Sequence, residues 1–218
     1  VIVMMNGIVG KNTHRILDVD EFRAFAMIDN YAPLIFINGA DSQGARLFSL
    51  FHEIVHIWLG ENDFYNAMGF DDKYLKKTEV ICNAVASELI VPKKEFLVKW
   101  DSNNEYDNIF NKIKCLAIAF RCGQMVIARK ALDNNKIDLD AYNEVKNNSI
   151  NFFIQQKEAK TSGGNYYNTM SARLDGCLVR ALCESILIGR TTYTDAYRLT
   201  NTNANTFNKI ANNFGGRL

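Results

Sequence analysis

The sequence predicts an α+β fold: a small, mostly antiparallel sheet, two helices packed on it, and a mostly α-helical carboxy-terminal region. Short β-branched and aromatic runs separated by turn residues dominate the first forty positions, which is typical of strands. Apolar residues then recur at spacings of three and four, which is typical of amphipathic helices. We expect two regions, residues 1–100 and 101–218, with the polar run 101–107 at their boundary.

Composition limits the classes of function. A hydrophobic share of 48% allows a sizeable core, and a net charge of +1 provides no overall basic field. Residues 101–218 carry fifteen basic and eleven acidic side chains, which is only weak support for a DNA partner. Five cysteines without a C-x-x-C pair indicate reduced thiols and a cytoplasmic protein. We expect no membrane span, because no apolar run approaches the roughly 18–20 residues required.

Two strand pairs are predicted in the first region. Residues 1–5 form an apolar strand, and the tight-turn signal Asn6–Gly7 predicts that residues 8–9 pair back on it. Residues 22–29 and 33–38 are separated by three residues, which predicts an antiparallel hairpin. The first residue is a valine rather than a methionine, so we expect the natural protein to begin upstream, with a further amino-terminal domain.

A helix is predicted over residues 45–59, capped at its amino end by Asp41 or Ser42. Nearly all of its side chains are apolar, as expected for a helix that is buried on most sides. The exceptions recur at spacings of three and four and so form one polar stripe: Arg46, Ser49, His52, Glu53 and His56.

This stripe contains the motif H-E-x-x-H. His52 and His56 are four residues apart, so both imidazoles lie on one helix face, where a single Zn²⁺ can bind both. Glu53 is then placed to act as a general base on a water at the same ion. The alternative is that the two histidines are hydrogen-bonded core residues and that Glu53 is solvated. We disfavour this alternative because burying a carboxylate beside two imidazoles is costly without a partner. His14 lies in a polar stretch and is expected at the surface.

A third ligand is expected on a helix over about residues 72–90, which must end before a proline. Glu79 shares a polar stripe with Asn83, four residues later, whereas Glu88 lies near the helix end among charged residues. The stripe favours Glu79 over Glu88. Cys82 is the alternative ligand that is not a carboxylate.

Long stretches of the chain resemble the ImmA/IrrE family of zinc-dependent metallopeptidases. The similarity covers residues 21–60 and the run Glu79–Pro92, which fits the family motif E-x-x-(A/C)-N-x-x-A-x-x-(L/I)-(L/I)-x-P. In that family the glutamate of this motif is the third zinc ligand. Residues 116–137 resemble the helix-turn-helix-like segment of longer bacterial and phage members, and residues 163–167 resemble their G-G-N-Y-Y stretch.

This resemblance implies a zinc endopeptidase with His52, His56 and Glu79 as ligands and Glu53 as general base, in a zincin-like domain over residues 1–100. It also implies that the substrate is a regulatory protein such as a transcriptional repressor. An oxyanion-stabilising side chain is usually needed as well. Its candidates are three tyrosines, which are Tyr65, Tyr74 and Tyr106.

The second region is predicted to contain a helix-turn-helix-like segment at about residues 109–137, with a break at 121–123. Its cations, among them Arg121, Arg129 and Lys130, could contact phosphates, but a structural helical hairpin is the favoured interpretation. The second candidate function is a regulatory or toxin–antitoxin-type module that binds DNA or protein and retains a non-catalytic metal site.

Further along, residues 157–167 are predicted to form a loop. Residues 173–188 are predicted to form an amphipathic helix, with Leu174, Cys177, Leu178, Ala181, Leu182 and Ser185 on one side.

Overall fold

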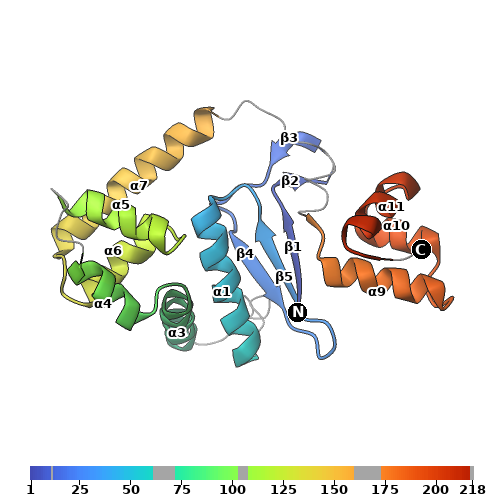
Figure 1. Ribbon diagram of the computed structural model, residues 1–218, viewed down its shortest axis with the longest axis horizontal. Helices are drawn as coiled ribbons and strands as arrows, with labels where there is room; N and C mark the ends of the chain where they lie inside the picture. The colour runs from blue at the N-terminus through green and yellow to red at the C-terminus, as the bar shows by residue number, and fades with distance from the viewer. Residues whose placement is uncertain (11, 61–71, 103–107, 160–172, 217–218) are drawn as a thin grey trace.

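The computed structural model describes residues 1–10, 12–60, 72–102, 108–159 and 173–216. Small sheets and many helices confirm the predicted α+β fold (Figure 1). No helix in this described part is both long enough and apolar enough to cross a bilayer. The strands are β1 (Ile2–Asn6), β2 (Ile8–Val9), β3 (Asn12–Ile16), β4 (Ala24–Met27) and β5 (Leu34–Asn38). The helices are α1 (Gln43–Leu59), α3 (Asp72–Ile90), α4 (Lys93–Ser102), α5 (Ile109–Ala119), α6 (Gln124–Asp133), α7 (Leu139–Ala159), α9 (Gly176–Leu187), α10 (Tyr193–Thr200) and α11 (Ala204–Asn213).

The central sheet has the strand order β1-β5-β4. β4 and β5 pair antiparallel, as predicted for this hairpin. The predicted hairpin of β1 with residues 8–9 is wrong: β1 pairs parallel with β5, and β2 pairs antiparallel with β3 in a separate sheet. The chain after β1 runs against the residues after β5, where the Gly39 amide donates to the Asn6 carbonyl at 2.8 Å. A Cβ at Gly7 would lie 2.9 Å from the Ala40 nitrogen, so this glycine serves a close approach of two chain segments.

The two faces of the central sheet are covered by different elements. Ala26, Ile35 and Ile37 are buried on the face that packs against α1. The opposite face carries an aromatic group in which the rings of Phe25 and Phe36 stack with centroids 5.3 Å apart. Helix α1 therefore lies directly on the sheet, which fixes the position of the predicted motif.

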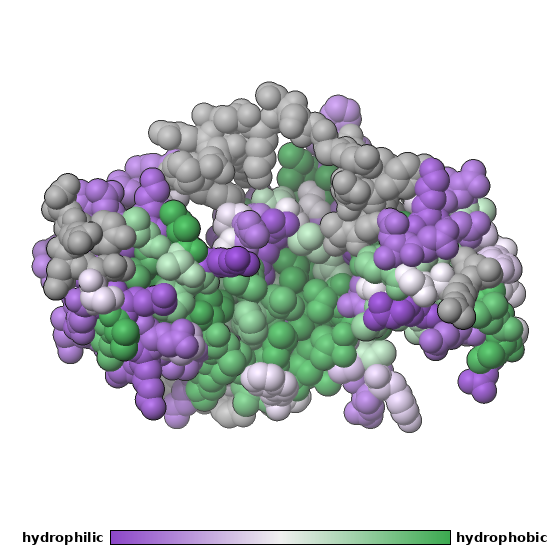
Figure 2. All heavy atoms as spheres, viewed as in Figure 1, coloured by the Kyte–Doolittle hydropathy of each residue, from purple (hydrophilic) through white to green (hydrophobic). Residues whose placement is uncertain are grey.

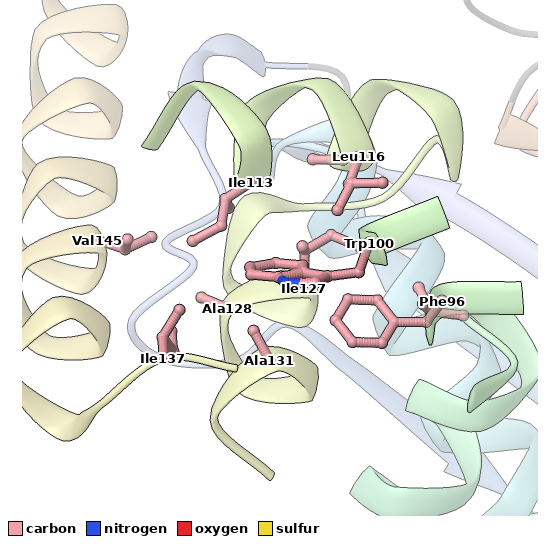
Figure 3. Close-up of a cluster of buried hydrophobic side chains, with 11 residues drawn as sticks. Phe96, Trp100, Ile113, Leu116, Ile127, Ala128, Ala131, Ile137 and Val145 are labelled. Carbon is pink, nitrogen blue, oxygen red and sulfur yellow. The ribbon is translucent and has the colours of Figure 1, made fainter. Parts of the chain in front are cut away.

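Helices α4 to α7 form a separate core beside α1 and α3 (Figure 1). Figure 3 shows this core, in which Phe96 and Trp100 of α4 face Ile127 of α6 and Leu116 of α5. The helix pair α5 and α6 was predicted from the sequence, whereas α4 and α7 were not. The core joins residues from both sides of position 101, and the boundary predicted there stays a prediction.

The last three helices pack around a third core at the opposite end of the chain (Figure 1). Helix α9 was predicted, and the face assigned to it was right in part: Leu174 and Leu182 are buried, and Leu178 packs against the same core. Val179, Leu182, Cys183 and Ile186 are buried, whereas Cys177 and Ala181 of the predicted face are exposed. The buried face is thus turned by about one residue, since apolar side chains surround most of this helix.

Candidate metal centre

Local signals at both ends of α1 fix the helix that carries the motif. The Ser42 side chain caps its amino end by accepting a hydrogen bond from the Ala45 amide at 3.3 Å. Gly60 ends the helix in the left-handed conformation, with φ 75°, and its amide bonds back to the carbonyls of the last turn. Three residues of the polar stripe of this helix are buried: Ser49, Glu53 and His56 are all at most 7% exposed.

Helix α3 lies beside α1 and supplies the predicted third side chain. It ends at Ile90, just before the proline at position 92, as the sequence requires. Cys82 and Ala86 are completely buried, and small side chains of this kind allow two helices to approach closely. Glu79 of α3 thereby meets His52 and His56 of α1, and one ligand atom from each of the three lies within 4.8 Å of the others.

The distances among the three side chains suit a small tetrahedral ion. Ligand atoms that each lie about 2.0–2.1 Å from Zn²⁺ are about 3.3 Å apart when the site is tetrahedral. The Nε2 atoms of His52 and His56 are 3.0 Å apart. The two carboxylate oxygens of Glu79 lie 3.2 Å from the His52 Nε2 and 3.3 Å from the His56 Nε2. Two imidazole nitrogens and a carboxylate therefore converge as zinc ligands do.

The site is closed at its base and open on one side. The side chain of His56 is 1% exposed, that of His52 is 15% exposed and that of Glu79 is 49% exposed. Hydrogen bonds from His52 and then from His56 hold the pKa of the Glu79 carboxyl well below its usual range, against an opposing effect of burial. The carboxylate is therefore ionised at neutral pH, as a metal ligand must be, and its exposed side leaves room for water or substrate.

A further side chain contacts one of the predicted ligands. The Nδ1 of His52 lies 3.1 Å from the Oδ1 of Asn83, so that with a metal ion bound at Nε2 the Nδ1–H would donate to this oxygen. Asn83 was placed on the polar stripe by the sequence, but this role was not predicted for it. The available signal was its position one helical turn after Glu79, which directs both side chains toward α1.

The other residues considered for the site do not belong to this group of three side chains. Glu88 accepts hydrogen bonds from Lys130 of α6 and from the Lys93 amide, so it is occupied away from the site. Cys82 is buried and does not belong to the ligand group. His14 is exposed on β3, as expected. The three tyrosines considered for the oxyanion, Tyr65, Tyr74 and Tyr106, have side chains outside the described part of the chain.

Two histidines on one helix and a glutamate on the next, with one open side, define a metallopeptidase-type protein. A family model for the IrrE N-terminal-like domain of the M78 peptidases matches residues 12–131, which is more than half of the chain. The chain therefore belongs to this ImmA/IrrE family, whose members in general depend on zinc. A second model, a domain of unknown function (DUF8813), matches residues 174–213. No curated protein and no solved structure matches the chain.

Proposed function

We propose that the protein is a zinc endopeptidase in which His52, His56 and Glu79 hold the ion and Glu53 is the general base. The observation that carries the proposal is the convergence of the three side chains at separations suited to tetrahedral zinc. Glu53 adds to this support, because a purely structural metal site has no use for a buried carboxylate between its two histidine ligands.

Each side chain has a defined part in this chemistry. Bound zinc would polarise the scissile carbonyl and acidify the attacking water. Glu53 accepts the proton of that water and delivers it to the leaving amine. Glu79 contributes a negative charge that balances the ion, and Asn83 keeps the His52 ring in the required tautomer.

The sheet offers a place for the substrate backbone. β4 is an edge strand of the central sheet, and it contacts helix α1. An extended peptide can pair with such an edge through main-chain hydrogen bonds. The substrate would then lie along β4 and present one peptide bond to the side of the site on which Glu79 is exposed.

The proposed substrate is a regulatory protein such as a transcriptional repressor. Support for this substrate class comes from the resemblance to regulator-type bacterial and phage members, in residues 21–60 and in the run that follows Glu79. The segment at 109–137 is the basis of the other candidate, a DNA-binding regulatory module. Its cations favour a structural role: Lys130 pairs with Glu88, and Arg129 pairs with Asp133 at 3.0 Å.

The first test is metal content. Elemental analysis should find about one zinc per chain in the wild type and in Glu53→Gln, and much less in Glu79→Ala. A proteome-derived peptide library, digested with the zinc-loaded chain and read by mass spectrometry, then tests turnover. We expect cleavage by the wild type and none by Glu53→Gln, which keeps the size of the side chain but removes the base. A wild type that will not load with added zinc, or equal cleavage by Glu53→Gln, contradicts the proposal.

A further inference from the structure

The carboxy-terminal helices form a compact unit with its own core. Helices α9, α10 and α11 coincide with the residues matched by the domain of unknown function. Val179 of α9, Ala196 of α10 and Phe207 of α11 are all completely buried in their shared cluster. The Asp175 side chain caps α9 and also accepts a hydrogen bond from the Val3 amide at 3.1 Å, which ties the unit to β1.

The connection between α10 and α11 is a short turn whose ends are both hydrogen-bonded. Asn201 ends α10 in the left-handed region, with φ 53° and ψ 39°, and its amide bonds to the Arg198 carbonyl at 3.2 Å. The Asn203 side chain then caps α11 by accepting from the Thr206 amide at 2.9 Å. Two helices that are joined by such a three-residue turn, with a third helix packed against them, have the arrangement of a helix-turn-helix domain.

The inner face of α11 is fixed by packing. Phe207 and Ile210 are completely buried. The ring of Tyr197 on α10 packs edge-on against that of Phe207, with the ring centroids 5.6 Å apart. Because these contacts set the rotation of α11 about its axis, they also determine which side chains point outward.

The outer face of α11 carries side chains suited to a base edge and a phosphate. Asn205, Asn208, Lys209 and Asn212 are exposed at spacings of three and four, so they share one face. An asparagine amide can make a paired hydrogen bond with adenine in the major groove, and a lysine can contact a phosphate. The sequence of α11 contains no carboxylate that would repel phosphates.

Two arginines precede α11 in the sequence. Arg190 and Arg198 are exposed just before α10 and near its end. In Figure 2 hydrophilic residues lie beside more apolar ones at the right-hand end of the molecule, where α9–α11 lie in Figure 1. The positive charge is modest, so sequence readout by the amides must contribute more than general attraction to phosphates.

We infer that α9–α11 is a helix-turn-helix unit that binds double-stranded DNA, with α11 as the recognition helix in the major groove. This site differs from the 109–137 segment for which DNA contacts were considered above. It also requires no metal at the H-E-x-x-H site, so Glu53→Gln should bind DNA as the wild type does.

The test is selection of binding sites from a randomised pool of duplex DNA by the full chain, followed by fluorescence anisotropy on the selected site. We expect enrichment of a short motif that contains adenine. Asn208→Ala should weaken binding to that motif by about 5- to 150-fold and relax the preference at one position. Lys209→Ala should weaken binding to all sequences alike and reduce the slope of log affinity against log salt by about one.

The matched control is Arg121→Ala, in the turn of the other helix pair, which should leave affinity and preference unchanged. Circular dichroism and thermal melting establish that each variant is folded, and Asn208→Asp, expected to abolish binding, provides a second substitution at the same exposed position. The proposal is overturned if no motif is enriched over the random pool. It is also overturned if Arg121→Ala abolishes binding while both Asn208 variants bind like the wild type.

Discussion

Replacing Asn83 by alanine should weaken zinc binding without unfolding the protein. The substitution removes the oxygen that accepts from the His52 Nδ1–H. The distance of 3.1 Å between the His52 Nδ1 and the Asn83 Oδ1 is that of an ordinary hydrogen bond. Loss of such an orienting partner typically lowers metal affinity by about 10–100-fold. Asn83 is exposed, so water can replace part of the lost bond, and we expect the low end of that range. A tenfold change corresponds to about 1.4 kcal/mol in binding free energy.

The assay is competition for zinc against a chromophoric chelator at neutral pH, with circular dichroism to verify the fold. Asn83→Asp keeps an acceptor at the same position and should bind zinc at least as tightly as the wild type. Ser87→Ala, one turn further along the same stripe of α3, is the matched control and should change little. If Asn83→Ala binds zinc within about twofold of the wild type, or if Ser87→Ala is equally impaired, Asn83 does not orient His52.

Three other predictions concern stability and reactivity. Gly44→Ala should lower the free energy of unfolding by about 1–3 kcal/mol in a denaturant titration, because the new Cβ would lie 2.6 Å from the Gly123 nitrogen; an unchanged midpoint would contradict this contact. Burial raises the pKa of the Cys122 thiol to about 11, so iodoacetamide at pH 8 should modify exposed Cys177 well before Cys122, as peptide mapping by mass spectrometry can check; equal rates would refute it. Burial opposes ionisation of Asp175, but hydrogen bonds from Val3, Leu178 and Cys177 outweigh it and lower its pKa. The carboxylate therefore stabilises the fold above the unfolded-state pKa of about 3.9, and this stability is lost as pH falls through the lower folded-state value. Asp175→Asn, which can still cap α9, should consequently lose less stability than the wild type on acidification below about pH 4; identical acid unfolding curves would exclude this role.

The parts of the fold that the sequence predicted depend on local geometry. His52 and His56 must share a helix face because of the helical period, and the same period places Glu79 and Asn83 together on α3. The β4–β5 hairpin is equally local, since only six residues separate the two strands in the structure. In these cases a few neighbouring residues contain all the information that the geometry requires.

The parts that were missed depend on contacts between distant segments. The parallel pairing of β1 with β5 joins Ile2 to Leu34, and a tight-turn signal after β1 could not reveal it. The polar run 146–149 interrupts the apolar residues of helix α7, and among its residues whose burial the structure describes Val145 alone is buried, so α7 was not predicted. The face of α9 is decided by its partners α10 and α11, because its own sequence is apolar on most sides.

The two helix pairs of this chain show why a helix-turn-helix pattern alone does not identify a DNA-binding surface. Both turns contain a left-handed residue that is not glycine, Arg121 before α6 and Asn201 before α11, so their backbones follow similar paths. They differ in what the second helix contacts. Lys130 of α6 is buried in an ion pair with Glu88 of α3, so α6 contacts the helix that carries Glu79.

Helix α11 carries exposed asparagines on its outer face. Its buried side chains face α9 and α10, and its exposed asparagines point away from both. From the sequence, DNA contacts were considered only for the pair with a glycine in its turn, α5 and α6. In the structure Gly44 of α1 lies against the backbone of this turn, since a Cβ at Gly44 would be 2.6 Å from the Gly123 nitrogen. The turn of α5 and α6 is therefore packed against α1, and the surface that we assign to a nucleic acid is on the other pair.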